Sequence, residues 1–142
     1  MAKYVFCESK ADLAKLVLKR VVEVATTKDY PNESFGTIDF KVEDIPTPKE
    51  ASEMTEEELA DNYENVAAGS YGIKTVSLFD QDGIQLVFGY YGGTEGIQAV
   101  YFDDNYEIDE DDGFDRILNA INLLLSFEIP QLCGNFLVKI SD

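Results

Sequence analysis

Hydrophobic residues near the N-terminus recur at the three- and four-residue spacing of one helix face. These residues are Leu13, Leu16, Val17, Val21 and Val24. Ser9 stands where an N-cap residue is expected, and Asp12 follows three residues later as a weak capping box. The pattern predicts an amphipathic helix from Ser9 to about Thr27.

After a loop that contains Pro31, the hydrophobic period changes from that of a helix to that of a strand. Apolar side chains at 38, 40 and 42 alternate with Asp39 and Lys41. An alternation of this kind is typical of a strand with one face buried and the other in water. We predict a strand from Phe35 to Val42.

Capping residues mark the next helix. Thr47-Pro48-Lys49-Glu50 offers an N-cap threonine, a proline at the first helical position and a glutamate at the third. Thr55 and Glu58 repeat the capping signal. The helix is therefore predicted to begin at either threonine and to end near Val66.

The middle of the chain is rich in strand-forming residues. Three strands are predicted, over residues 71–79, 84–91 and 96–102. The pair Asp82-Gly83 is typical of a tight hairpin, and the glycines of residues 92–96 allow a second turn. These strands are expected to form a three-stranded antiparallel meander.

The C-terminal third begins with an acidic segment, residues 103–113, which we predict to be a loop. A helix from Phe114 to Phe127 and a strand from Phe136 to Ile140 follow. This order predicts a single α+β domain over residues 1–142. We expect a mainly antiparallel sheet of four to five strands, with about three helices on one face.

The composition of the chain narrows the classes of function that are possible. The chain has 142 residues, with 28 Asp and Glu against 11 Lys and Arg, for a net charge of −17. This charge excludes direct nucleic-acid binding through a basic surface and disfavours an anionic membrane. No apolar run has the length of a signal peptide or membrane span, so a cytoplasmic location is expected. There, Cys7 and Cys133 are expected to be free buried thiols rather than a disulfide.

The negative charge is concentrated in two segments, whereas residues 1–28 carry six bases and three acids. The predicted second helix has five acids at helix spacing, with Leu59, Tyr63 and Val66 on the other side. We expect these carboxylates to form one exposed stripe. Its members are Glu50, Glu53, Glu57, Asp61 and Glu64.

The second acidic segment lies between residues 103 and 115 and contains no base. Its acids are Asp103, Asp104, Glu107, Asp109, Glu110, Asp111, Asp112 and Asp115. Tyr106, Ile108 and Phe114 interrupt it and can fix it to the rest of the fold. Both segments also have an interpretation without a binding role. Runs of charge usually form a solvated surface, and a high net charge keeps a protein soluble.

Chemistry-bearing motifs are missing from the sequence. The chain has no histidine, which excludes Ser-His and Cys-His catalysis, and its cysteines form no C-x-x-C pair. The acidic segments before Gly83 and Gly113 do not place their acids at the positions that an EF-hand loop requires relative to its glycine. The glycine-rich segment at residues 89–96 matches no phosphate-binding motif. We expect no catalytic residue, metal site or cofactor. A looser Ca²⁺ or Mg²⁺ site remains an alternative.

The sequence therefore predicts a non-enzymatic acidic inhibitor that binds a basic protein surface through its two acidic segments. The partner class that fits is a nuclease, restriction or CRISPR-type enzyme, whose groove the carboxylates would occupy as a nucleic-acid mimic. Alternatives are a divalent-cation protein, an acidic interaction domain without mimicry, and a ligand site over Tyr90, Tyr91 and Tyr101. The basic first helix leaves a homodimer open.

Overall fold

The structure is a computed structural model. It describes residues 2–26, 34–42, 45–64, 73–80, 83–90, 96–102, 107–126 and 134–141. Within these residues the chain forms six strands and four helices. In chain order they are β1 (Lys3–Cys7), α1 (Lys10–Thr26), β2 (Ser34–Lys41), α2 (Pro48–Ser52), α3 (Glu56–Glu64), β3 (Ile73–Asp80), β4 (Ile84–Tyr90), β5 (Gly96–Tyr101), α4 (Glu110–Leu124) and β6 (Phe136–Ser141).

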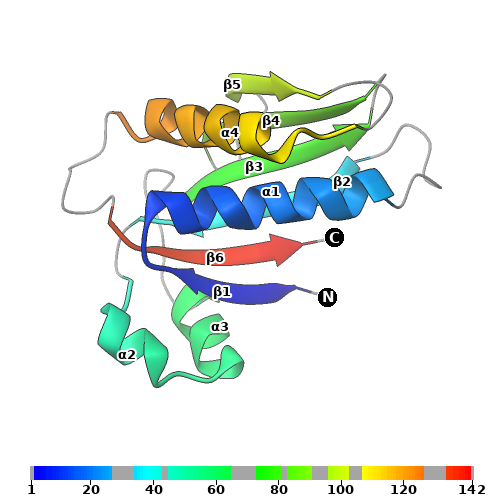
Figure 1. Cartoon of the computed structure of the whole chain (residues 1–142). Coiled ribbons are helices and arrows are strands. Elements are labelled where there is room, and N and C mark those ends of the chain that lie inside the picture. The colour runs from blue at the N-terminus through cyan, green and yellow to red at the C-terminus, as the bar shows by residue number, and fades with distance from the viewer. Residues whose placement is uncertain are drawn as a thin grey trace.

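The strands form one antiparallel sheet in the order β1-β6-β2-β3-β4-β5. The predicted meander is confirmed as β3, β4 and β5. The first and last strands pair with each other, with Val5 opposite Val138, so the two ends of the described chain lie together (Figure 1). The α+β class and the antiparallel sheet are confirmed, with six described strands in place of four to five.

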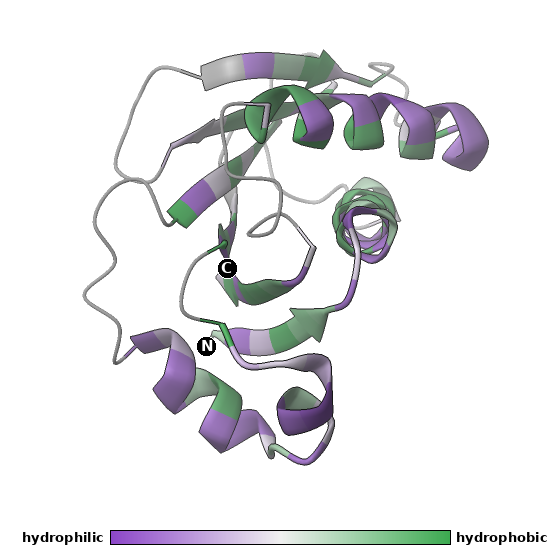
Figure 2. Ribbon diagram, turned by 90° about the vertical axis from the view of Figure 1, so that its left-hand side faces the viewer, coloured by the Kyte–Doolittle hydropathy of each residue, from purple (hydrophilic) through white to green (hydrophobic). Residues whose placement is uncertain are grey.

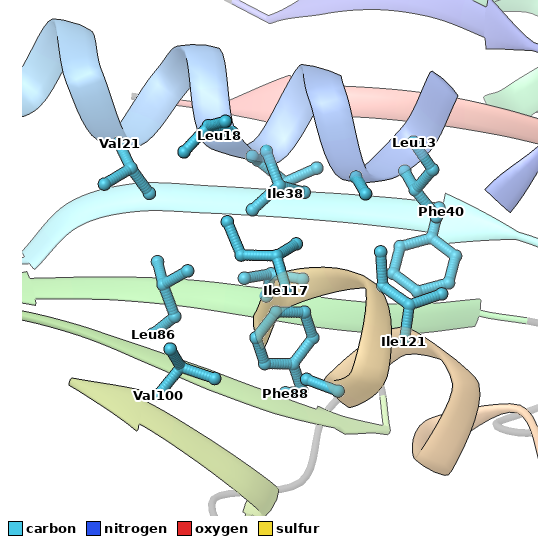
Figure 3. Close-up of a cluster of buried hydrophobic side chains, with 14 of the residues drawn as sticks. Leu13, Leu18, Val21, Ile38, Phe40, Leu86, Phe88, Val100, Ile117 and Ile121 are labelled. Carbon is cyan, nitrogen blue, oxygen red and sulfur yellow. The ribbon is translucent and has the colours of Figure 1, made fainter. Parts of the chain in front are cut away.

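Helices α1 and α4 lie side by side on one face of the sheet and enclose the main core (Figures 1 and 2). Leu13, Val17 and Val21 of α1 are fully buried, as their spacing predicts. Figure 3 shows side chains of α1, α4 and the strands directed toward one another, among them Ile38, Phe88 and Ile121. The Phe40 ring also meets the Phe136 ring edge-on at 5.8 Å.

A second, smaller apolar cluster lies on the opposite face of the sheet. Along β6, Phe136 and Val138 belong to the main core, whereas Leu137 between them belongs to the second cluster. Tyr63 of α3 packs there, with Leu59 partly buried beside it. Helix α3 therefore covers the β1–β6 end of the sheet from the other side, as Figure 2 shows.

Four sequence-based expectations need correction. The helices are not confined to one face of the sheet, because α3 packs on the face opposite α1 and α4. Strand β1 was not predicted, because a five-residue strand carries little periodic signal and its partner β6 lies at the other end of the chain. The single helix expected from Thr47 is two helices, with residues 53–55 between them. The loop expected up to Gly113 ends earlier, because Asp109 caps α4 and acids suit its positively polarised first turn.

Candidate functional site

Each of the two acidic helices begins with a threonine cap. Thr47 Oγ1 accepts a hydrogen bond from the Glu50 amide at 3.2 Å, and Glu50 Oε2 accepts one from the Thr47 amide at 2.9 Å. Thr55 Oγ1 likewise accepts from the Glu58 amide at 3.2 Å. Because Thr55 starts a new helix, α2 and α3 do not form one rod. The bonds from Thr47 lower the pKa of the Glu50 carboxyl.

The C-terminal end of α3 is fixed to the sheet by Glu64. Its Oε1 lies 2.7 Å from Lys139 Nζ of β6 and 2.6 Å from the Tyr4 hydroxyl of β1. The bond from Lys139 lowers the pKa of Glu64, and the bond from Tyr4 lowers it further. The same contact raises the pKa of Lys139. Glu64 therefore holds the helix in place.

Two charged side chains of β2 are buried. Because they alternate with the apolar residues of the strand, the sequence predicted that they would face solvent. Lys41 is fully buried; its Nζ lies 3.4 Å from the Asn62 carbonyl oxygen of α3 and 5.9 Å from the centre of the Tyr63 ring. A cation there suits the negatively polarised end of α3. Asp39 is 8% exposed and accepts a hydrogen bond from Thr75 Oγ1 at 2.8 Å. Burial raises the pKa of Asp39.

Four other carboxylates of these helices are exposed to solvent. Glu53, Glu56, Glu57 and Asp61 make no ion pair or side-chain hydrogen bond with any residue that the structure describes. We call these four residues the α2–α3 acidic surface. Since Lys41 and Lys139 contact α3 from the sheet side, the charge on its outer side stays unneutralised.

The expected five-residue stripe is therefore only partly available. Glu53 and Asp61 belong to the α2–α3 acidic surface together with Glu57, whereas Glu50 and Glu64 make contacts within the chain. No local sequence signal indicated the Glu64 contact, because Lys139 is 75 residues away. The repeated T-x-x-E signal offered Thr55 as an alternative start of one helix, whereas the structure has helix starts at both threonines.

The second acidic segment lies at the start of α4. Asp109 Oδ1 accepts hydrogen bonds from the amides of Asp111 and Asp112, at 3.1 and 3.2 Å. Asp112 also lies 4.0 Å from Arg116 one turn later. Glu107, Asp109, Glu110, Asp111 and Asp112 are all exposed. We call residues 109–112 the α4 acidic turn; Asp103 and Asp104 lie outside the described residues.

The two acidic sets lie at opposite edges of the sheet. Helix α3 contacts β1 and β6, and α4 contacts β4 and β5, as Figure 1 shows. Six strands about 4.8 Å apart separate the outermost strand axes by roughly 24 Å. Since the two sets are so far apart, they do not form one continuous acidic surface.

A groove of about 650 Å³ runs between α1, β1 and the α2–α3 pair. Its floor is the outer edge of β1 and residue 8, and we call it the β1 groove. One wall is α1, with Asp12, Lys15 and Lys19, and the other includes Ala51 and Leu59. The groove was not predicted from the sequence, because β1, which forms its floor, was not predicted.

Other candidate sites find little support within the described residues. No group of three or more His, Cys, Asp or Glu in that part of the chain is arranged to hold a metal ion. Tyr90 packs against the main core, whereas Tyr101 is 62% exposed and opposite Gln85, on the other face. Residues 91–95, including Tyr91, fall outside the described ranges.

Cys7 is buried and free, as expected, and burial raises the pKa of its thiol to about 12. Cys133 lies outside the described residues.

None of the described helices combines the length and apolarity needed to cross a membrane. Comparisons with protein-family models, curated proteins and solved structures find no match to this chain.

Proposed function

We propose that this protein is a non-enzymatic binding protein that contacts a positively charged surface of a partner through the α2–α3 acidic surface. The observation that carries the proposal is the set of four exposed carboxylates without a neutralising partner among the described residues. Caps at both helix starts and the Glu64 contact hold the backbone beneath them. A preorganised surface loses less conformational entropy on binding than a mobile one.

The net charge of −17 supports the same proposal through association kinetics. A strongly charged protein is steered toward an oppositely charged partner, and added salt screens this attraction beyond about 8 Å at physiological ionic strength. The α4 acidic turn supplies a second negative region at the far edge of the sheet. We assign it to this long-range steering and not to the contact itself.

We further propose a nucleic-acid-binding enzyme as the partner class, with the carboxylates standing in for phosphates. Glu57 and Asp61 are one helical turn apart, about 6 Å along the axis. Duplex DNA carries one charge per roughly 1.7 Å. The α2–α3 acidic surface would therefore replace a few phosphates in a basic groove rather than a long duplex.

The proposal is tested by capturing partners from a host lysate on immobilised protein at 0.15 and 0.5 M salt. The triple variant E53K/E57K/D61K should lose the captured partner. The variant E107K/E110K/D115K has the same net charge and should retain it. Equal capture by the wild type and the first variant would refute the role of the α2–α3 acidic surface.

Nucleic-acid mimicry has its own readout in the same assay. Excess DNA or RNA oligonucleotide should release a partner that is held in its nucleic-acid groove. If the oligonucleotide leaves the complex intact while E53K/E57K/D61K abolishes it, the partner is bound through a different basic surface. Mimicry would then be wrong, and the binding role would stand.

A further inference from the structure

The outer edge of β1 faces the β1 groove. Five consecutive positions, residues 4–8, line this groove. A strand that meets a pocket with one face contributes alternate residues, because successive side chains point to opposite faces. Consecutive lining residues therefore mean that the strand meets the groove along its edge, where its backbone is accessible.

Within the part of the chain that the structure describes, the backbone groups on this edge have no partner. Strand β1 ends the sheet order, and β6 is its only strand neighbour among the described residues. In an antiparallel pair, alternate residues direct their N–H and C=O groups away from the partner. No described residue hydrogen-bonds to the outward groups of β1. Such an edge is a template for an added strand.

Side chains around the edge are apolar in the middle and charged along one wall. Val5 and Leu16 are partly buried against the main core, and Leu59 stands in the opposite wall. Along α1, Asp12 is followed by Lys15 and Lys19 on the same helix face. No described residue forms an ion pair with either lysine.

The charges give the groove a direction. Strand β1 and helix α1 run antiparallel across the short connection at residues 8–9 (Figure 1). Glu8 and Asp12 therefore lie at the end of the groove near Cys7. Lys19 lies seven residues beyond Asp12, about 10 Å along the helix axis and toward the Tyr4 end.

We propose that the β1 groove binds an extended peptide segment of a partner protein as an added antiparallel strand on β1. The peptide carries a basic residue near its N-terminal side, facing Glu8 and Asp12. An apolar residue follows at the level of Val5 and Leu16, and then an acidic residue that faces Lys15 and Lys19. This site is separate from the α2–α3 acidic surface and does not depend on the function proposed above.

A peptide fits this groove better than a second copy of the chain. The groove between α1 and the α2–α3 pair has a volume of about 650 Å³. This is the size of a pocket for a small ligand or a short segment, and another sheet with its own flanking helices would not fit in it. Two copies would also bring together chains that each carry a net charge of −17. The mixed charges of the groove itself favour a peptide with both a base and an acid.

The test uses a labelled nine-residue probe, STKTVTETS, and its charge-reversed control, STETVTKTS. Fluorescence anisotropy with the full chain should show the probe binding about five- to tenfold more tightly, because the probe forms surface ion pairs where the control forms like-charge contacts. The variant K15E/K19E should remove this preference. The variant K10E/K49E has the same net charge outside the groove and should keep it.

Backbone methylation of the probe distinguishes strand addition from other binding. The probe is methylated on the amides of its central lysine, valine and glutamate, or instead on the two threonines between them. Only alternate amides of the added strand face β1. Methylation of one of these two sets should therefore abolish binding, whereas methylation of the other should leave the affinity within about threefold of that of the unmethylated probe. Amide hydrogen exchange should slow in residues 3–7 when the probe binds.

Three results would overturn the proposal. One is the absence of binding by both probes at 1 mM. Another is equal tolerance of both methylation sets, which would mean that backbone pairing is not used. The third is a concentration-dependent dimer in sedimentation that already protects the β1 amides, which would assign the edge to a second copy.

Discussion

Replacing Asp61 by lysine is expected to stabilise the protein. Asp61 lies in the last turn of α3, one turn after Glu57, and both side chains are exposed. Like charges at this spacing destabilise a helix, whereas glutamate followed four residues later by lysine stabilises it. A cation in the last turn also interacts favourably with the negatively polarised helix end, which contains no base in the natural sequence.

The magnitude follows from these two effects. Each i, i+4 pair is worth about 0.2–0.5 kcal/mol, so changing the pair with Glu57 from repulsive to attractive contributes about 0.4–1 kcal/mol. The helix-end interaction adds about 0.3–1 kcal/mol at low ionic strength. The free energy of unfolding should therefore rise by about 1–2 kcal/mol, and less at high salt.

Urea denaturation followed by circular dichroism, at 20 mM and 0.5 M NaCl, measures this change. The midpoint should increase by about 0.5–1 M urea at low salt, given an ordinary slope for a protein of this size. Asp112→Lys is the matched control. Asp112 is exposed in the first turn of α4, where an acid is favourable, and it lies 4.0 Å from Arg116 one turn later, so this variant should lose about 0.7–2 kcal/mol.

The two variants make the same chemical change at exposed positions, at opposite ends of a helix and beside neighbours of opposite charge, Glu57 and Arg116. If both shifted the midpoint in the same direction at low salt, the electrostatic reasoning would be refuted. A stabilised D61K that no longer captures the partner would show that α3 keeps this acid for binding, at the expense of stability.

Three further predictions concern the interior and the α3 contact. Because hydrogen bonds hold the folded-state pKa of Glu64 below its ordinary value, they stabilise the fold at neutral pH. This contribution is lost as the pH falls through the lowered pKa. In urea titrations from pH 6 to pH 3, the Glu64→Gln variant should therefore lose less stability than the wild type. Parallel losses in the two proteins would contradict this prediction. The pKa of Cys7 is raised to about 12, so its thiol should be unreactive at pH 8. In the Cys133→Ser variant, which leaves Cys7 as the single thiol, a thiol reagent should label the protein only after denaturation. Rapid labelling of the folded variant would disprove the burial of Cys7. A Cβ at Gly113 would lie 3.1 Å from Leu18 Cδ1 and 3.2 Å from Phe102 Cε1. Gly113→Val should therefore destabilise the protein by about 1–3 kcal/mol in urea titrations, and an unchanged midpoint would show that this contact is loose.

Local sequence signals predicted those elements whose causes lie within a few residues. The helix spacing of Leu13, Val17 and Val21 identified α1, because residues one turn apart share a face whatever the rest of the chain does. The two threonine caps depend on glutamates three residues away, so the sequence identified both as candidate helix starts, although as alternatives for one helix. Asp109 was missed as a cap because the acids after it were assigned to a loop.

The candidate sites depended on contacts between distant segments. The alternation around Lys41 correctly indicated a strand, but only the position of α3 over that face decides that this lysine is buried. The acid stripe was predicted from helix geometry, yet Lys139 and Tyr4 engage Glu64 from the two ends of the chain. Periodicity states which residues share a face and says nothing about what covers it.

The sequence by itself determined the α+β class, the meander, most helices and an acidic surface, because these follow from local backbone preferences and composition. Tertiary structure alone decided that β1 closes the sheet, that the two acidic sets are separated, and that the β1 groove exists. These features arise where segments far apart in the chain pair or pack. Such pairing depends on the free energy of the whole fold, which no short stretch of residues encodes.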